Sequence, residues 1–452
     1  MYIYIRFLIL TGICFFVPIQ QVFALVNVTT LPVIPVDKSN LNLFSTPIAY
    51  YQGDLFTVNV EPADSLNTGL NLKTVVRKAV DVDSQHWEWI SNTIDNKTIE
   101  DKYHTQASIA IDKQGYLHIA YGMHNMPWQY VISDQPSDIA SFSFFGDAIT
   151  MTDKISVKVF NKTPFPSIGN AAIPGNQVTY PAFFYDKNKD LYVTYRFAIK
   201  PKRAFKDRGF SGGIARYDVI KRTWLSLGGD IQVNKQDAEW MSNKITESLK
   251  PFAYRNQWAV YLPRLAFDDD NTMHVSWLWR EGGAGGDTTH PSYAYSPAND
   301  ANFYTSQQGK YALPISEGSA EWVGKPNIDK FDAISEIEVD ANYVYVLLHR
   351  QGNTRELLKL DRVAKKWKSS EDMPYSASIF KVDEEGGQWA FATGLRVLHR
   401  KTDKGSWQVV FKDDGADKYG YSKVLQIPGE KVFYIHTQSI NQESVKIYKL
   451  EY

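Results

Sequence analysis

The sequence predicts an all-β fold built from repeated four-stranded antiparallel units. Short segments of alternating apolar and polar residues recur from Leu55 to the end of the chain, whereas no long segment shows the period of an amphipathic helix. Many of these segments occur in pairs joined by an acidic or glycine-containing turn, which is typical of β-hairpins. The 27 tyrosines, 24 phenylalanines and 12 tryptophans also favour strands. Ala238–Leu249 is the one candidate for a short helix.

The clearest repeat is a hairpin with a polar turn. In its first copy the turn is Asp112–Gly115, where Gly115 can adopt a positive φ. A second hairpin with a late tryptophan follows several copies, and two hairpins make one four-stranded unit. The first hairpin recurs at Ser108–Tyr121, Pro181–Arg196, Pro263–Arg280, Ile334–Arg350 and Lys423–His436, and the second at Ile214–Leu227, Leu357–Ser369 and Val397–Val410.

Four-stranded units of this kind, arranged around an axis, form a β-propeller. The turn residues Asp112, Asp186, Asp268 and Asp340 are 74, 82 and 72 residues apart, which is longer than a minimal blade. We therefore expect insertions in loops on one face, where function concentrates. The length fits seven blades, although six or eight also fit, and a β-sandwich or jelly roll is the alternative. The final strand, Ile447–Tyr452, is expected to close the ring with the N-terminal segment.

Residues 1–24 have the features of a secretory signal, because Arg6 precedes an apolar stretch that is too short for an ordinary membrane span. We expect residues 25–452 to form a single catalytic propeller domain that is secreted or periplasmic. The only cysteine, Cys14, lies in the signal, so the mature chain has no disulfide. The net charge of -1 provides no basic field for nucleic acid. We expect a monomer with no nucleic-acid or membrane partner.

Two hairpins bring polar residues to their open ends. His104 and His124 flank the hairpin at Ser108–Tyr121, and Tyr180 and Arg196 flank the next one. If the two hairpins belong to adjacent blades, the four side chains converge on one rim. Each residue taken alone is as compatible with a strand end or a solvated loop.

These four residues are suited to removing a proton next to a carboxylate. They include no pair of carboxylates for ordinary glycoside hydrolysis and no nucleophilic serine or cysteine. Arg196 matches a carboxylate with two parallel hydrogen bonds and would stabilise an enolate-like transition state. A nearby arginine or protonated histidine would lower the pKa of Tyr180, which could protonate the departing oxygen. The pattern therefore predicts β-elimination at a uronic acid.

The stretch from Tyr103 to Asn125 (YHTQASIAIDKQGYLHIAYGMHN), followed by TYPAFFYD and LYVTYR, resembles the BNR-repeat propellers that include secreted ulvan lyases. The resemblance covers most of the mature chain and is most specific between residues 100 and 200. It implies a seven-bladed propeller that cleaves ulvan, a polysaccharide of sulfated rhamnose and uronic acid. It also implies catalytic roles for His104, His124, Tyr180 and Arg196. Substrate-binding roles are implied more loosely for Asn125, Arg264, Arg280 and His290.

Members of this family can hold a structural metal ion, but the mature chain has no cysteine to supply a thiolate ligand. We therefore assign no metal ligands and expect no cofactor to be required for catalysis. Three other functions stay open: a lyase acting on a different uronate polymer, a non-catalytic carbohydrate-binding propeller and a sialidase-like glycoside hydrolase. The last would be expected to carry repeated serine-aspartate-glycine-tryptophan turns, and none of the turns above has the full pattern.

Overall fold

In the residues that the structure describes, the regular structure is almost entirely β-strand, and Pro374–Ser376 forms the short 3₁₀ helix η2. The predicted all-β class is therefore confirmed. The computed structural model describes residues 26–36, 44–62, 72–81, 86–98, 106–126, 128–146, 176–200, 207, 209–232, 248–282, 287–323, 331–350, 354–368, 371–392, 394–413, 419–439 and 443–452. The proposed signal, residues 1–24, lies outside these ranges. The candidate helix at Ala238–Leu249 lies mostly outside them, and its last two residues form strand β17 (Ser248–Leu249) paired with β16 (Ile231–Gln232).

The first two sheets each contain four antiparallel strands, as expected of two consecutive hairpins. In the second sheet the intervening strand β9 (His124–Met126) is not part of the sheet. The first sheet has the order β3–β4–β5–β6 and the second the order β11–β10–β8–β7. Their strands are β3 (Ile48–Tyr51), β4 (Asp54–Pro62), β5 (Leu72–Asp81), β6 (Trp87–Thr98), β7 (Ser108–Ile111), β8 (Leu117–Ala120), β10 (Tyr130–Ser133) and β11 (Phe142–Phe144).

The next sheet differs from the prediction because it joins two units into one sheet of nine strands. Its first unit is β12–β15 and its second β18–β21, and one parallel bridge between Phe210 and Ala259 links them. The short strand β9 pairs with β12 along the edge opposite β13. The strands are β12 (Asn176–Tyr185), β13 (Leu191–Ala198), β14 (Phe210–Asp218), β15 (Thr223–Ser226), β18 (Trp258–Phe267), β19 (Met273–Glu281), β20 (Thr288–Ser296) and β21 (Glu321–Trp322).

Three further sheets complete the chain. Two of them contain β22–β26 and β27–β30, and the last has the order β1–β33–β32–β31 with β2 added to β33. The pairing of β1 with β33 confirms that the final strand joins the N-terminal segment. The strands are β22 (Phe331–Val339), β23 (Tyr343–Arg350), β24 (Arg355–Asp361), β25 (Lys366–Trp367), β26 (Glu371–Asp372), β27 (Ile379–Val382), β28 (Gln388–Ala392), β29 (Arg396–Arg400), β30 (Gln408–Lys412), β31 (Tyr419–Ile427), β32 (Val432–Ser439), β33 (Ser444–Glu451), β1 (Asn27–Thr30) and β2 (Ile34–Pro35).

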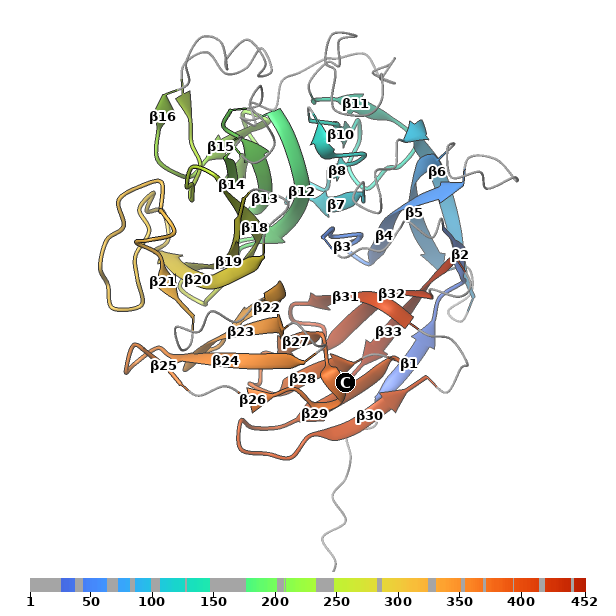
Figure 1. Ribbon diagram of the computed structural model, residues 1–452. Helices are drawn as coiled ribbons and strands as arrows, with labels where there is room; N and C mark the ends of the chain where they lie inside the picture. Colours follow the sequence, from blue (N-terminus) through green and yellow to red (C-terminus); the bar gives the residue numbers. More distant parts are fainter. Residues whose placement is uncertain are drawn as a thin grey trace, which may run out of the picture.

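The sheets are arranged around a common centre (Figure 1). Contacts run in chain order through β3, β7, β12, β18, β22, β27 and β31, and β31 in turn contacts β3. Apolar side chains fill the space between neighbouring sheets. Phe56 of β4 packs with Ile119 of β8, for example, and Leu55 packs with Ile447 of β33. This is a β-propeller arrangement, in which packing between sheets supplies the hydrophobic core.

Aspartate turns close the first hairpins, as the sequence predicts. One carboxylate oxygen of Asp112 accepts hydrogen bonds from the backbone N–H groups of Gln114 and Tyr116, while Gly115 has a φ of 92°. This is the local bonding that makes aspartate favourable in turns. The same two-bond arrangement recurs at Asp186, Asp268, Asp340 and Asp383.

These turns lie at one end of the sheets, where ion pairs connect neighbouring units. The Lys113 Nζ lies 2.6 Å from a carboxylate oxygen of Asp190, and the Lys187 Nζ lies 3.1 Å from one of Asp269. Arg362 also pairs with Asp268 across two sheets. The open ends of the hairpins, where the predicted site residues lie, are therefore at the opposite end of the same strands.

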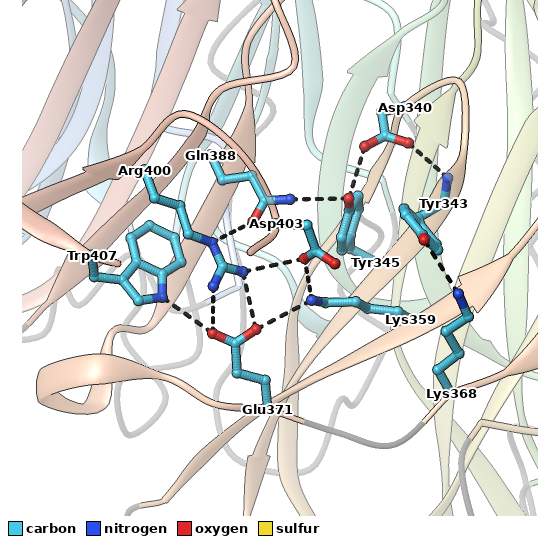
Figure 2. A network of polar contacts seen from close by, with 10 residues as sticks. All are labelled: Asp340, Tyr343, Tyr345, Lys359, Lys368, Glu371, Gln388, Arg400, Asp403 and Trp407. Atoms are coloured by element: carbon cyan, nitrogen blue, oxygen red, sulfur yellow. Dashed lines mark hydrogen bonds and ion pairs between the residues drawn. The ribbon is translucent and has the colours of Figure 1, made fainter. Parts of the chain in front are cut away.

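A partly buried polar network links the sheet of β22–β26 to the sheet of β27–β30 (Figure 2). The guanidinium of Arg400 donates two hydrogen bonds to Glu371, at 2.7 and 3.0 Å, and a third of 2.7 Å to Gln388. Gln388 donates to the hydroxyl of Tyr345, which donates to Asp340 at 2.8 Å. Every charge in this chain of contacts has a partner, as buried charges require.

Candidate active site

A β-bulge in β12 places Tyr180 at the open end of its hairpin. The register between β12 and β13 shifts between Thr179 and Ala182, and Tyr180 has a φ of 59°. Pro181, which has no N–H to donate, sits within the bulge. Bulges next to active sites commonly redirect one side chain. The ring of Tyr180 is 7% exposed, so it is held firmly by its surroundings.

His124 and Asn125 reach Tyr180 through the added strand β9. Thr179 pairs with His124, and the rings of His124 and Tyr180 are stacked with their centroids 6.0 Å apart. The hydroxyl of Thr179 accepts a hydrogen bond of 3.0 Å from the backbone N–H of Asn125 and donates to its side-chain oxygen at 3.3 Å. Three predicted residues, His124, Asn125 and Tyr180, therefore lie together.

Arg196 lies beside them at the end of β13, opposite Thr179 in the ladder. Its side chain is among the most deeply buried in the protein, with 1% exposed, yet Nε and Nη1 have no hydrogen-bond partner among the described residues. Nη2 makes a long contact of 3.4 Å to the Thr179 hydroxyl, and the guanidinium also interacts with the Tyr261 oxygen. Three aromatic rings pack against the guanidinium at 4.6–5.0 Å: Tyr180, Phe210 and Tyr261. Burial of an unpaired cation costs several kcal/mol. Unfavourable features of this size are found mainly at functional sites, so the arrangement indicates that Arg196 has a functional role.

Tyr261 completes the group, and the sequence analysis did not select it. It lies in β18 just before a second bulge, whose register shift falls between Tyr261 and Arg264. Tyr180 donates a hydrogen bond to the Tyr261 oxygen, which also accepts one of 2.8 Å from Nη1 of Arg280. Tyr261 thus lies between two guanidinium groups, those of Arg196 and Arg280. The proline two residues later, Pro263, which repeats Pro181 of the previous unit, was the available sequence signal.

The two phenols have opposite electrostatic environments. Burial and the neighbouring charge of Tyr261 raise the pKa of Tyr180 well above its ordinary value, despite the nearby Arg196. Burial also acts to raise the pKa of Tyr261, but the charges of Arg196 and Arg280 outweigh it and lower that pKa overall. Arg196 does lower the pKa of Tyr180, as expected, but burial and the charge of Tyr261 outweigh that effect. The lowered pKa belongs to Tyr261, because its oxygen accepts hydrogen bonds from Tyr180 and Arg196 and interacts with the charges of both arginines.

Such a pair can move protons in both directions. Two titratable groups whose pKa values are pushed apart are the usual sign of an acid and a base in one site. Tyr180 keeps its proton and can donate it, whereas Tyr261 can accept one. Arg196 supplies a fixed positive charge that is not already neutralised by a described carboxylate.

His104 falls outside the described residues, and two other predicted residues, Arg264 and His290, lie elsewhere. Arg264 is buried in β18, where burial lowers its pKa and the charge of Glu336 in β22 partly offsets that effect. His290 of β20 is grouped instead with Trp258 and Trp322. The structure thus joins His124, Tyr180 and Arg196 directly, and links Asn125 and Arg280 to them through one intervening residue each.

The described residues contain no group of three or more histidine, cysteine or acidic side chains placed to hold a metal ion.

None of the helices in the described part of the chain is long and apolar enough to cross a membrane.

The sequence profile of the BNR repeat-containing family matches residues 48–393, which is most of the chain. The chain belongs to this family. The match includes all the strands that carry the site, from β9 to β20. No curated protein matches the sequence significantly.

Solved structures of polysaccharide lyases have the same fold. The crystal structure of polysaccharide lyase Uly1 superimposes with a TM-score of 0.61 at 11% identity, covering 94% of this chain and 99% of the other. An ulvan lyase of polysaccharide lyase family 25 gives a TM-score of 0.58 at 11% identity, covering 93% and 94%. The same type of enzyme bound to -[GlcA(1-4)Rha3S]- gives 0.57 at 12% identity, again covering 93% and 94%. At 11–12% identity, these similarities support the β-propeller fold of the present chain and no more than the fold.

Proposed function

We propose that the protein is a polysaccharide lyase that cleaves ulvan by β-elimination at the uronic acid and releases unsaturated oligosaccharides. One observation carries the proposal: the buried guanidinium of Arg196, unpaired at Nε and Nη1, lies against two phenols whose pKa values are shifted in opposite directions. A uronate carboxylate would satisfy the two free donor groups. The ligand of the solved ulvan lyase and the family resemblance support the choice of polymer.

Arg196 would bind the uronate carboxylate and stabilise the charge that develops when the neighbouring C5 proton leaves. The base takes that proton, the C5–H electrons form the C4=C5 double bond, and the C4–O bond breaks. Tyr180 then protonates the departing oxygen. When Tyr261 is the base, the hydrogen bond between the two tyrosines can return the proton from Tyr261 to Tyr180 after turnover, so no cofactor is needed to reset the site.

Two residues are candidates for the base. The sequence favours His104, while the described geometry favours Tyr261, because its lowered pKa makes the phenolate accessible. His124 stacks on Tyr180 and would orient its hydroxyl. In glucuronate the C5 proton and the leaving oxygen lie on the same face of the ring, so a single tyrosine could serve both. In iduronate they lie on opposite faces, so two groups are required.

We further infer that the two halves of the nine-stranded sheet are separate blades, which would make seven blades in all. The predicted signal at residues 1–24 supports export, and extracellular action suits an enzyme whose substrate is too large to enter a cell.

The test is incubation of the purified mature protein with ulvan and with other uronate polymers, followed by ultraviolet absorbance and mass analysis. Elimination predicts an absorbing double bond at the new non-reducing end, with fragment masses that sum to that of the intact polymer. Fragments that have gained water would show a hydrolase and refute the proposal. Binding to ulvan with no fragments would indicate a carbohydrate-binding propeller, and cleavage of a different polymer would revise the substrate.

A further inference from the structure

A second group of aromatic and charged residues lies next to the active site and takes no part in the proposed chemistry. We call it the outer aromatic cluster, and it consists of Trp258, His290, Trp322, Arg255 and Glu317. The His290 ring lies 4.3 Å from Trp322 and 5.9 Å from Trp258, measured between centroids, so the imidazole contacts both indoles. A positive φ of 52° at His290 turns its side chain into this position.

The polar members of the cluster are held by direct contacts. Arg255 lies over the ring of Trp258, 4.6 Å from its centroid, and pairs with the carboxylate of Glu317. That carboxylate also lies 3.7 Å from Nδ1 of His290, which contacts the hydroxyl of Thr289 at 2.8 Å. Glu317 is buried, whereas 42% of the Arg255 side chain is exposed. The cluster therefore presents an exposed guanidinium and partly exposed rings above a buried acceptor.

The cluster adjoins the reaction centre through the strands that carry Tyr261 and Arg280. Trp258 begins β18 three residues before Tyr261, which is about 10 Å of extended strand. Arg280 pairs with Ala259 on one side and Thr288 on the other, two residues before His290. Because successive side chains alternate between faces, Trp258 and Tyr261 lie on opposite faces of β18. A polymer that reaches both must pass over the open end of this sheet.

The charge of the cluster differs from that of the reaction centre. Arg255 is neutralised by Glu317, whereas Arg196 has no described carboxylate beside it. Burial and the charge of Arg255 lower the pKa of His290, so its imidazole is uncharged at neutral pH. Uncharged rings next to hydrogen-bonding groups suit a sugar that offers one apolar face and several hydroxyls. A carboxylate or sulfate group would bind only weakly here, because Glu317 already neutralises the charge of Arg255.

We propose that the outer aromatic cluster is a subsite for an uncharged face of a sugar residue in the polymer, one or two units from the bond that is broken. The inference rests on the proposed polysaccharide substrate and adds to it the position and chemistry of a second binding point. Trp322 supplies a partly exposed ring, and His290 contacts that ring and helps to fix its orientation.

The test compares Trp322→Ala and Trp322→Phe with the unmodified protein. The substrates are ulvan octasaccharides and the shortest ulvan oligosaccharide that is cleaved. Trp322 lies in a two-residue edge strand, so its replacement should leave the fold intact, which circular dichroism and thermal melting would verify. Tyr343→Ala is the matched control, because Tyr343 also carries a cation over its ring, Lys368 at 4.8 Å, but lies at the turn end of the sheets.

Trp322→Ala should raise KM for the octasaccharide about tenfold, which corresponds to about 1.4 kcal/mol, with kcat unchanged. KM for the shortest substrate should not change, Trp322→Phe should recover most of the loss, and Tyr343→Ala should behave as the unmodified protein. Unchanged KM for the octasaccharide, or equal losses on both lengths, would overturn the subsite while leaving the lyase proposal intact.

Affinity electrophoresis of the intact proteins in gels containing ulvan separates the two proposals. If ulvan is bound but not cleaved, weaker retardation of Trp322→Ala than of Tyr343→Ala supports the subsite and refutes the lyase. Equal retardation of the two variants refutes the subsite. If the unmodified protein neither binds nor cleaves ulvan, both proposals fail.

Discussion

Replacing Arg196 with methionine is expected to abolish activity without unfolding the protein. The guanidinium is 1% exposed, and two of its nitrogen atoms have no described partner. Loss of a preorganised group of this kind costs about 3–4 kcal/mol of transition-state stabilisation, or roughly 10²–10³-fold in rate. Arg196→Lys should recover little, because an ammonium group cannot reproduce two parallel hydrogen bonds to a carboxylate.

The effect on stability follows from the same contacts. Arg196→Met loses cation–π contacts with three rings, each worth about 0.5–1 kcal/mol, so the total is roughly 2 kcal/mol. The substitution also removes the cost of keeping an unpaired charge out of water, and replacing buried charges with apolar residues is often neutral or stabilising by about 1–4 kcal/mol. The two effects nearly offset each other. We expect the free energy of unfolding to change by less than about 2 kcal/mol in either direction.

Arg400→Met provides the matched control, because Arg400 is equally buried but fully paired (Figure 2). Its removal leaves Glu371 without the two hydrogen bonds that it receives from the guanidinium. Glu371 is partly exposed and keeps its contacts with Lys359 and Trp407, so the loss of stability should be about 1.5–3 kcal/mol, the contribution of hydrogen bonds to charged groups. Activity per folded molecule should be unchanged, because Arg400 lies in a different sheet from the active site.

Urea denaturation would measure the stability of both variants, and initial rates of ultraviolet absorbance on ulvan would measure their activity. We expect the two quantities to change independently: Arg196→Met should be stable and inactive, while Arg400→Met should be destabilised but active where it is folded. Normal turnover by folded Arg196→Met would refute the assignment of the carboxylate-binding group. A stability loss above about 3 kcal/mol would show instead that Arg196 has a structural partner.

Three further predictions concern proton transfer and acid stability. If Tyr261 acts deprotonated as the proposed base, kcat/KM should rise as the pH passes its lowered pKa. Arg280→Gln removes one of the two charges that lower this pKa, so the rising limb of the pH profile should move to higher pH, and an unmoved limb would argue against Tyr261 as the base. Tyr180→Phe keeps the ring but removes the proton, so turnover on glucuronate- and iduronate-containing oligosaccharides should be lost, and full activity of the folded variant would exclude the mechanism. Burial lowers the pKa of His436 to about 3, against roughly 6.5 in an unfolded chain, so the unfolded state alone takes up a proton between these values. The stability that this group contributes above pH 6.5 should therefore fall by about 1.4 kcal/mol per pH unit below that pH. Between pH 7 and pH 5, His436→Gln should lose less free energy of unfolding than the unmodified protein. An identical loss in the two proteins would contradict the role of His436.

The hairpins could be located from the sequence because their signals are local. Alternation with a period of two places Ile109 and Ile119 on the core side, and Asp112 forms its turn with neighbours no more than four residues away. The pairing of the last strand with the first was also predictable, because a ring of sheets would otherwise leave an open edge. The parallel bridge between Phe210 and Ala259 was not, since it depends on how two units approach each other.

The open ends of the hairpins identified Tyr180, Arg196 and His124 from the sequence alone, since the two ends of a hairpin must meet. The role of Tyr261 depended on the tertiary structure. Its pKa is a sum of burial and of charges from β13 and β19, and only the bulges in β12 and β18 bring these groups within contact. The sequence thus determined which strands carry polar residues at their ends. The packing of separate strands decided which phenol holds its proton, because an electrostatic environment is set by neighbours in space and not by neighbours along the chain.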